Sequence, residues 1–168
     1  HNATIQNQLN QEISPYYNII DFTQFIPMFG FGRSLRKDRS ALETEVAVMF
    51  ENGMDSYHKK DFKSAIEHLS KATENTPNQW DQWLFLGFSY FLDRKAQLAI
   101  QALLKARKLS KYSMKIERDW YLTQAYLLNN EVDEAIYLLE ELKNTAGPYS
   151  IKANTLLSDI IATQDKKK

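Results

Sequence analysis

Apolar and small residues recur in the middle of the chain with a period of 34 residues. The first copy carries Gly53, Ala65, Ile66, Leu69, Lys71 and Ala72. The second copy carries Gly87, Ala99, Ile100, Leu103, Lys105 and Ala106. A fixed period of this length predicts a helix-turn-helix unit that stacks on copies of itself.

The apolar spacing and the residues that start and stop helices place the individual elements. Ser40 to Glu43 form a capping box, Asp61 and Asn78 are expected to cap later helices, and Pro77 and Gly147-Pro148 interrupt the pattern. We expect helices at about 41–58, 61–75, 79–92, 95–109, 114–129, 131–143 and 149–163. The last of these has no mate and is expected to cap the open end of the array.

The segment before the repeats has a different character. Residues 3–13 carry apolar positions four apart and predict a short amphipathic helix, which Ser14-Pro15 ends. The stretch from Tyr16 to Phe31 is rich in aromatic residues but follows neither the helical nor the strand period. A solvated linker does not have this composition, so the stretch is expected to lie against another surface.

The second copy of the repeat resembles a tetratricopeptide (TPR) repeat. It meets the family pattern through Trp83, Leu86-Gly87, Tyr90, Ala99, Leu103 and Ala106, with Lys111 where proline is usual. The first copy matches through Gly53, Ala65, Leu69, Ala72 and Pro77 but has Met49, Asn52 and Ser56 at the Trp, Leu and Tyr positions. The third is offset by two residues: Leu122, Tyr126, Ala135 and Leu139 match, Thr123 replaces the glycine and Asp119 the tryptophan.

The predicted fold class is therefore all-α, a TPR-like array of three helix-turn-helix units with a C-terminal capping helix and an N-terminal aromatic segment. The expected divisions are a lead-in at 1–39, repeats over 40–145, and a capping helix with a basic tail at 146–168. The three repeats are expected at about 41–77, 78–112 and 113–145.

The resemblance also implies a site, because TPR domains hold ligand peptides in a concave groove lined by the first helix of each repeat. Carried over position by position, the groove here is aromatic and apolar. Its predicted partner-binding residues are Phe50, Met54, Tyr57, Leu84, Phe88, Phe91, Trp120 and Gln124, with Leu127 beside them. The Lys, Asn and Arg residues with which some TPR domains grip a carboxylate are missing, since those positions hold Phe50, Met54, Phe85, Glu117 and Tyr121.

An aromatic surface of this size is expected to be covered. One hypothesis is that the chain's own Tyr16–Phe31 segment docks in or beside the groove. The other is that an external apolar peptide, or a second copy of the chain in a homo-oligomer, fills it. Both make the protein a non-catalytic interaction module with a protein or peptide partner.

Composition and charge narrow the chemistry. The chain has 168 residues, with 21 basic and 21 acidic residues and no cysteine. The charge balance does not favour nucleic acid, and the three histidines have no metal-ligand spacing. No nucleotide-binding, hydrolase or zinc-protease motif occurs, so we expect no catalytic residues, metal, cofactor or small-molecule substrate. An enzyme without a recognisable motif is the remote alternative.

A looser resemblance concerns location. The aromatic lead-in, the three TPR units, Gly147-Pro148-Tyr149 and the final helix are similar to the extracytoplasmic region of some bacterial membrane-anchored, anti-sigma-like proteins. That resemblance implies a sensor or regulatory domain outside the cytoplasm. Because the chain begins at His1, we expect a fragment or mature form, and a membrane anchor upstream is left open.

Overall fold

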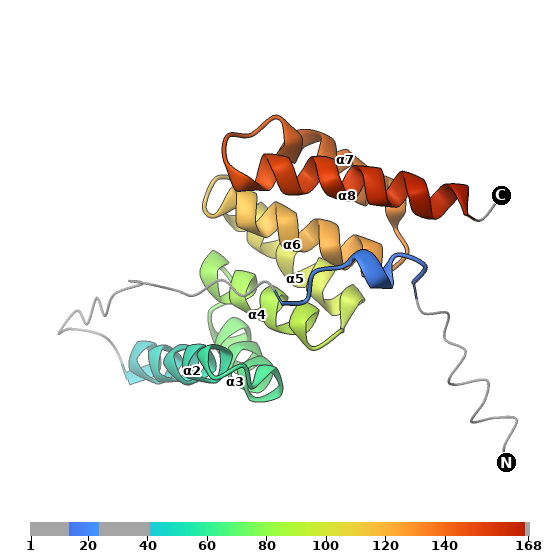
Figure 1. Cartoon of the computed structure of the whole chain (residues 1–168). Coiled ribbons are helices and arrows are strands. Elements are labelled where there is room, and N and C mark those ends of the chain that lie inside the picture. The colour runs from blue at the N-terminus through green and yellow to red at the C-terminus, as the bar shows by residue number, and fades with distance from the viewer. Residues whose placement is uncertain (1–13, 24–40, 167–168) are drawn as a thin grey trace, which may run out of the picture. The chain divides into compact units, whose positions relative to one another are not determined.

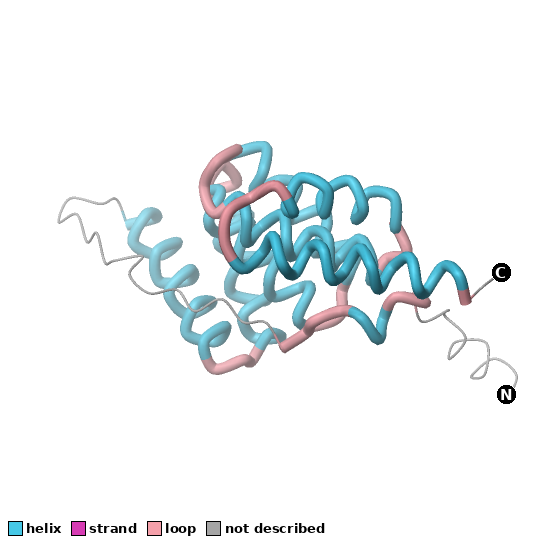
Figure 2. Tube along the Cα trace, turned by 45° about the horizontal axis from the view of Figure 1, so that its top comes forward, coloured by secondary structure: helices cyan, strands magenta, loops and turns pink. Residues whose placement is uncertain are grey.

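The computed structural model describes residues 14–23 and 41–166; for residues 41–44 it describes the backbone only. The expected helix at 3–13, the capping box at Ser40 and most of the segment after Thr23 lie outside these residues. The described chain contains helices and connecting turns and no strand (Figure 2). No helix in these ranges combines the length and apolar character needed to cross a bilayer.

The described residues fall into two compact units. The central unit runs from Phe22 to Arg118, and the terminal unit combines residues 14–21 with the chain from Asp119 onward.

The central unit contains two helix pairs. Helix α2 (Ala41–His58) packs on α3 (Phe62–Asn75), and α4 (Trp80–Leu92) packs on α5 (Ala96–Leu109). Contacts of α4 with α3 and α2 join the two pairs. In α3 the buried side chains are Ala65, Ile66, Leu69, Ala72 and Thr73, one stripe of an amphipathic helix.

The terminal unit is built from helices that follow in the same order. Helix α6 (Lys115–Leu128) enters it at Asp119, and α7 (Val132–Lys143) and α8 (Pro148–Asp165) complete it. Helices α7 and α8 lie side by side (Figure 1). Pro148 stands in the first turn of α8, where its missing N–H costs no helical hydrogen bond. A short 3₁₀ turn, η1 (Tyr17–Ile19), packs against α8.

The predicted fold class is confirmed: the chain is an all-helical repeat array with a final helix after the third pair. Asp61 caps α3 as expected, because its carboxylate accepts a hydrogen bond from the Ser64 amide at 3.1 Å. The predicted cap at Asn78 is wrong. Helix α4 begins one residue later, Gln79 stands at its N-cap without a side-chain cap, and the Asp81 carboxylate accepts from the Gln82 amide instead.

The turns inside the three helix pairs share one backbone geometry. Lys60, Arg94 and Asn130 all have positive φ, at 59°, 64° and 61°. In the second turn the Arg94 amide donates to the Phe91 carbonyl and the Lys95 amide to the Tyr90 carbonyl. Equivalent pairs of bonds close the other two turns, which is the pattern of a Schellman C-cap. The repeat therefore extends to the backbone conformation of residues that share no side-chain type.

Candidate binding face

The predicted groove residues fall on three helices and in both units. Phe50, Met54 and Tyr57 lie on α2, and Leu84, Phe88 and Phe91 lie on α4, all in the central unit; Trp120 and Gln124 lie on α6 in the terminal unit. Their side chains are buried, apart from Phe50, which is half-buried. Whether a partner binds them stays a prediction.

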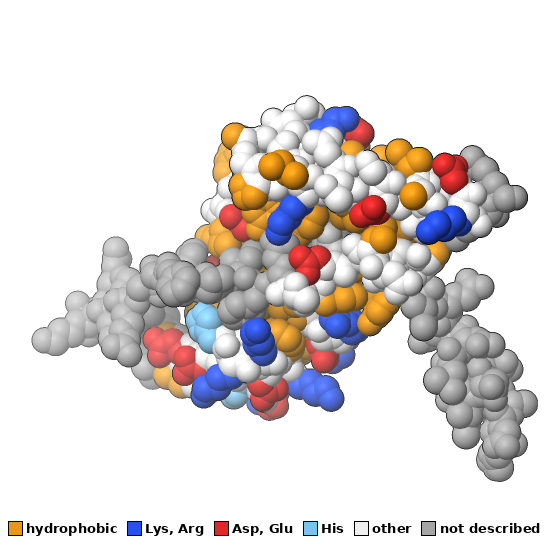
Figure 3. Space-filling view, viewed as in Figure 1, with side chains coloured by type: hydrophobic (Ala, Val, Ile, Leu, Met, Phe, Trp, Pro, Cys, Tyr) orange, Lys and Arg blue, Asp and Glu red, His pale blue; other side chains and the backbone are white. Residues whose placement is uncertain are grey.

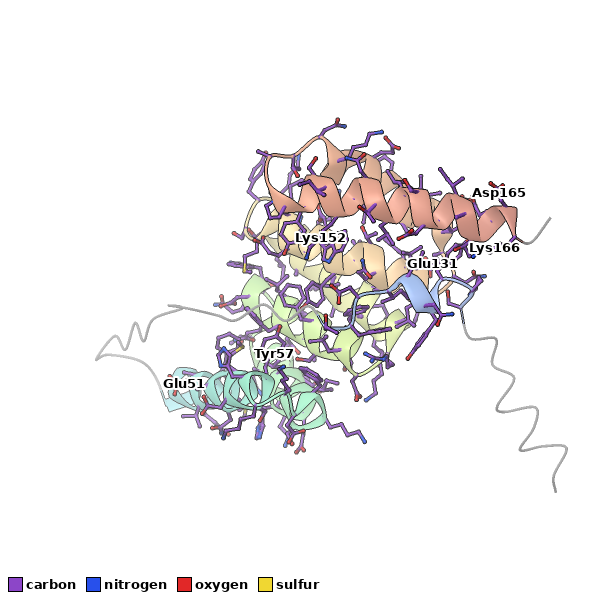
Figure 4. The ribbon with its side chains drawn as sticks, viewed as in Figure 1. Glu51, Tyr57, Glu131, Lys152, Asp165 and Lys166 are labelled. Carbon is purple, nitrogen blue, oxygen red and sulfur yellow. The ribbon has the colours of Figure 1, made fainter. Side chains whose placement is uncertain are left out.

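In the central unit these residues form a cluster of aromatic rings between α2 and α4. The Tyr57 and Phe85 rings meet edge to face with centroids 5.5 Å apart, and Phe85 meets Phe88 in the same way at 5.5 Å. Tyr57 lies on the side of α2 that is turned to α4 (Figure 4). Phe85 was not among the predicted groove residues, although it stands between two that were.

One aromatic residue from the N-terminal segment completes this cluster. Phe22 stacks on Phe91 with ring centroids 5.2 Å apart and an interplanar angle of 18°. On the other side of the Phe22 ring lies the Arg94 guanidinium, whose Cζ is 3.3 Å from the ring centroid. We use the name aromatic face for Tyr57, Phe85, Phe88 and Phe91, and the name strap for residues 14–23.

Residues 14–21 of the strap pack within the terminal unit (Figure 1). The Ser14 hydroxyl donates to the Leu127 carbonyl, and the Asp21 amide donates to Gln124 Oε1 at 3.0 Å. Tyr16 and Ile20 are buried, with 3% and 8% of their surface exposed. Both the backbone and the side chains of the strap are thus held by the folded helices.

Helices α6 and α8 form a second aromatic contact in the terminal unit. The Trp120 and Tyr149 rings meet at 5.7 Å, and the Lys152 ammonium lies 5.7 Å from the Trp120 centroid and 5.5 Å from that of Tyr149. Lys152 reaches from α8 toward α6 (Figure 4). In the described chain, Trp120 Nε1 and Gln124 Nε2 are buried donors without a hydrogen-bond partner.

The described charged groups include one carboxyl group whose pKa is shifted by burial. Burial raises the pKa of Asp81. The hydrogen bond that its carboxylate accepts from the Gln82 amide acts in the opposite direction and lowers the pKa. Asp81 stands in the first turn of α4, where an acidic residue complements the helix dipole. No cluster of metal-ligating side chains occurs in the described ranges. In Figure 3 charged groups of both signs lie among hydrophobic ones over α7 and α8.

Sequence reasoning missed three residues. Ser14 and Arg94 contribute to the contacts of the strap, and Arg118 holds the connection after α5. Arg118 is 1% exposed and donates to the carbonyls of Ser110 and Lys111 at 2.9 and 3.3 Å. It thereby closes the connection in which the third repeat gains its extra residues. The repeat could have pointed to Arg94, because Lys60, Arg94 and Asn130 stand at equivalent positions of the three units. No pattern in the sequence pointed to Ser14 or Arg118.

Comparison with known proteins finds a solved structure with a similar fold. The structure is similar to the N-terminal domain of stress-induced protein-1 (STI-1) from C. elegans, with a TM-score of 0.59 and 21% sequence identity. The similarity covers 70% of this chain and 98% of that domain. No protein-family model and no curated protein matches the sequence. The fold is therefore a TPR-like helical-repeat array, as the sequence predicted.

Proposed function

We propose that the chain is a non-catalytic protein-interaction module that binds an extended, aromatic segment of a partner protein over its aromatic face. The observation that carries the proposal is the docking of Phe22 on Phe91. A segment outside the repeat helices has its ring stacked on α4, at a residue that was assigned to the binding surface from the TPR resemblance.

The terminal unit, taken by itself, holds a peptide main chain in a separate contact with the strap. An extended peptide presents backbone amides that need acceptors, and Gln124 Oε1 accepts from the Asp21 amide at 3.0 Å. Such a bond does not depend on the side chain of the residue that is held. Backbone bonds then supply affinity, while side-chain sites supply specificity.

The strap gives the module two states in this proposal. In one state Phe22 covers Phe91 of the aromatic face, and in the other a partner segment takes its place. A second copy of the chain is one source of such a segment, so self-association is an outcome that the experiment must register. The placement of the module outside the cytoplasm rests on the sequence resemblance alone and remains a prediction.

The test is selection of displayed random peptides on the full chain and on its Phe22→Ala variant. We expect enrichment of peptides with Phe, Tyr or Trp, and stronger enrichment on the variant because its face is less well covered. Affinities of the selected peptides should fall by up to about tenfold in F22A/F91L, which keeps an apolar side chain at 91 but removes the ring.

The matched control is Tyr137→Ala, which changes an exposed aromatic residue, 61% accessible, on α7. It should leave the affinities unchanged. Light scattering of the same samples measures self-association. Failure to enrich any peptide on the variant, with a monomeric mass throughout, would contradict the proposed function.

A further inference from the structure

Arg94 occupies a backbone conformation that normally favours glycine. Its φ of 64° lies in the left-handed region, as do those of Lys60 and Asn130 in the equivalent turns. A residue with a Cβ atom is strained in this conformation, and helices commonly end there in glycine. A strained position that carries a long cationic side chain raises the question of what that side chain does.

The Arg94 side chain covers an aromatic ring. Its guanidinium Cζ is 3.3 Å from the centroid of Phe22, while its Nη1 donates to the Leu92 carbonyl at 3.1 Å. The hydrogen bond fixes the guanidinium at the C-terminal end of α4, from which it extends over the ring.

The opposite face of the Phe22 ring is covered as well. Phe91, of which 1% is exposed, stacks on it nearly in parallel at 5.2 Å. The ring is therefore held between a buried aromatic side chain and a planar cation, all within the central unit. Phe91 and Arg94 together form what we call the ring slot.

We propose that the ring slot is a recognition site for an electron-rich aromatic side chain, Tyr or Trp, in an extended partner segment, and that Phe22 is the internal ligand that this side chain replaces. The inference rests on the proposed function and specifies its partner. An aliphatic side chain can cover Phe91, but it lacks the negative face of a π-system that attracts the guanidinium.

Because the internal ligand is a phenylalanine, Phe22, a partner side chain can displace it. Attraction between a cation and a ring is strongest for Trp and weaker for Phe. A partner with Trp at this place gains more from Arg94 than Phe22 does, and one with Tyr gains about as much, while Phe91 stacks on either. The slot is thus filled in the free protein by an aromatic residue that a partner can outcompete.

The first measurement uses the full chain and hydrogen exchange at the amides of Phe22 and Thr23, which belong to the central unit with the ring slot and report docking of the strap there. We expect F22W to slow exchange and F22L to accelerate it. Arg94→Gln should accelerate exchange about two- to fivefold when residue 22 is Phe and have little effect in the F22L background. Equal effects of R94Q in both backgrounds would overturn the ring preference.

Glycine at two of the equivalent turns gives a matched pair of variants. R94G relieves the backbone strain and removes the guanidinium, so it should accelerate strap exchange. K60G relieves the same strain in the first turn without touching the ring slot and should leave strap exchange unchanged. The same change in exchange for R94G and K60G would show that the turn, rather than the guanidinium, controls the strap.

The second measurement adds a labelled peptide of residues 14–23 to the full-length F22A chain and follows fluorescence anisotropy. Four peptides carry Trp, Phe, Leu or pentafluorophenylalanine at position 22. We expect affinity to fall from Trp to Phe and again to Leu, with the fluorinated ring, whose face is not electron-rich, well below Phe.

The outcomes separate this inference from the proposed function. Equal affinity of all four peptides would overturn the ring preference and leave a less selective peptide-binding face. Binding by none of them, while selected peptides do bind the chain, would show that partners dock outside the ring slot and would overturn the replacement of Phe22.

Discussion

The backbone of Gly87 lies against the side chain of Leu103 so closely that a Cβ atom at position 87 would stand 2.7 Å from both Cγ and Cδ2 of Leu103. The first repeat has the same relationship: a Cβ on Gly53 would stand 2.7 Å from Leu69 Cγ and 2.8 Å from Cδ2. The glycine of each repeat is therefore required by the close approach of the paired helix.

Gly87→Ala should destabilise the protein although alanine is the better helix former. The helix-propensity gain is about 1 kcal/mol, whereas overpacking against a fully buried Leu103 costs about 1–3 kcal/mol and its relief requires a shift of two helices. We expect the free energy of unfolding in urea to fall by up to about 2 kcal/mol, and Gly53→Ala to behave in the same way.

A double mutant identifies the cause. The loss of stability measured for G87A/L103A should be smaller than the sum of the losses of G87A and L103A, because the truncated side chain makes room for the new methyl group. Gly147→Ala is the control, since its φ is 99° and no atom lies within 4 Å of the added Cβ. It should be destabilising through backbone strain alone, and L103A should not relieve it. Additive losses in G87A/L103A would contradict the packing explanation.

Glycine at two of the left-handed turn positions should stabilise the fold. Lys60 and Asn130 are exposed and have φ of 59° and 61°. Lys60→Gly should raise the free energy of unfolding by about 0.5–1 kcal/mol, since relief of strain exceeds the extra entropy of the unfolded chain. Asn130→Gly should gain less, because asparagine tolerates this conformation better than lysine. A loss of stability in K60G would show that the side chain contributes more than its backbone strain costs.

The helices could be predicted from the sequence because their boundaries depend on local chemistry. Predicted ends agree with the structure to within two residues from α3 to α8, since Asp61, Pro77 and Pro148 act on the backbone next to them. Asn78 was assigned wrongly because Gln79 is the residue at the N-cap, and the Asp81 carboxylate holds the first turn. The predicted N-cap, Asn78, and the observed one, Gln79, are neighbours in the sequence.

The candidate binding face was only partly predictable for a different reason. The repeat pattern assigns Phe88 and Phe91 to one side of α4 because their spacing follows the helical period. It contains no information on contacts between distant segments, such as that of Phe22 with Phe91 or of Asp21 with Gln124. The aromatic composition of the strap predicted that it lies against a surface, but not which ring it covers.

Asp61 should make the stability of α3 depend on pH. Its pKa is lowered, mainly by the hydrogen bond from the Ser64 hydroxyl and next by that from the Ser64 amide. A carboxyl group with a depressed folded-state pKa stabilises the fold above its unfolded pKa, and the contribution is lost as the pH falls through the folded value. Thermal unfolding of the wild type and D61N should therefore differ in their pH dependence below about pH 4.

The measurement for Asp61 is an NMR titration of its side-chain carboxyl carbon together with unfolding of the variants. D61N keeps an oxygen that accepts from the Ser64 amide and should lose less stability at neutral pH than D61A. Ser64→Ala removes the first cause of the shift and should bring the pKa of Asp61 closer to its ordinary value. An unchanged pKa in S64A would contradict this assignment.

Arg118 should be the most sensitive charged residue of the central unit. Its guanidinium donates to the carbonyls of Ser110 and Lys111 from a position 1% exposed, so it serves as the hydrogen-bond donor for the connection after α5. Arg118→Ala removes these charge-assisted bonds and leaves a large cavity, which should cost about 2–4 kcal/mol.

Arg118→Lys tests whether charge alone suffices. A lysine keeps the charge but not the planar fork that reaches two carbonyls, so we expect it to recover less than half of the loss in urea denaturation. Hydrogen exchange in residues 110–114 should accelerate in both variants, because these residues are held by the guanidinium. Lys108→Ala, at an exposed position on α5, is the control and should stay within about 0.5 kcal/mol of wild type. Full recovery by R118K would show that one charge-assisted bond is enough to fix the connection.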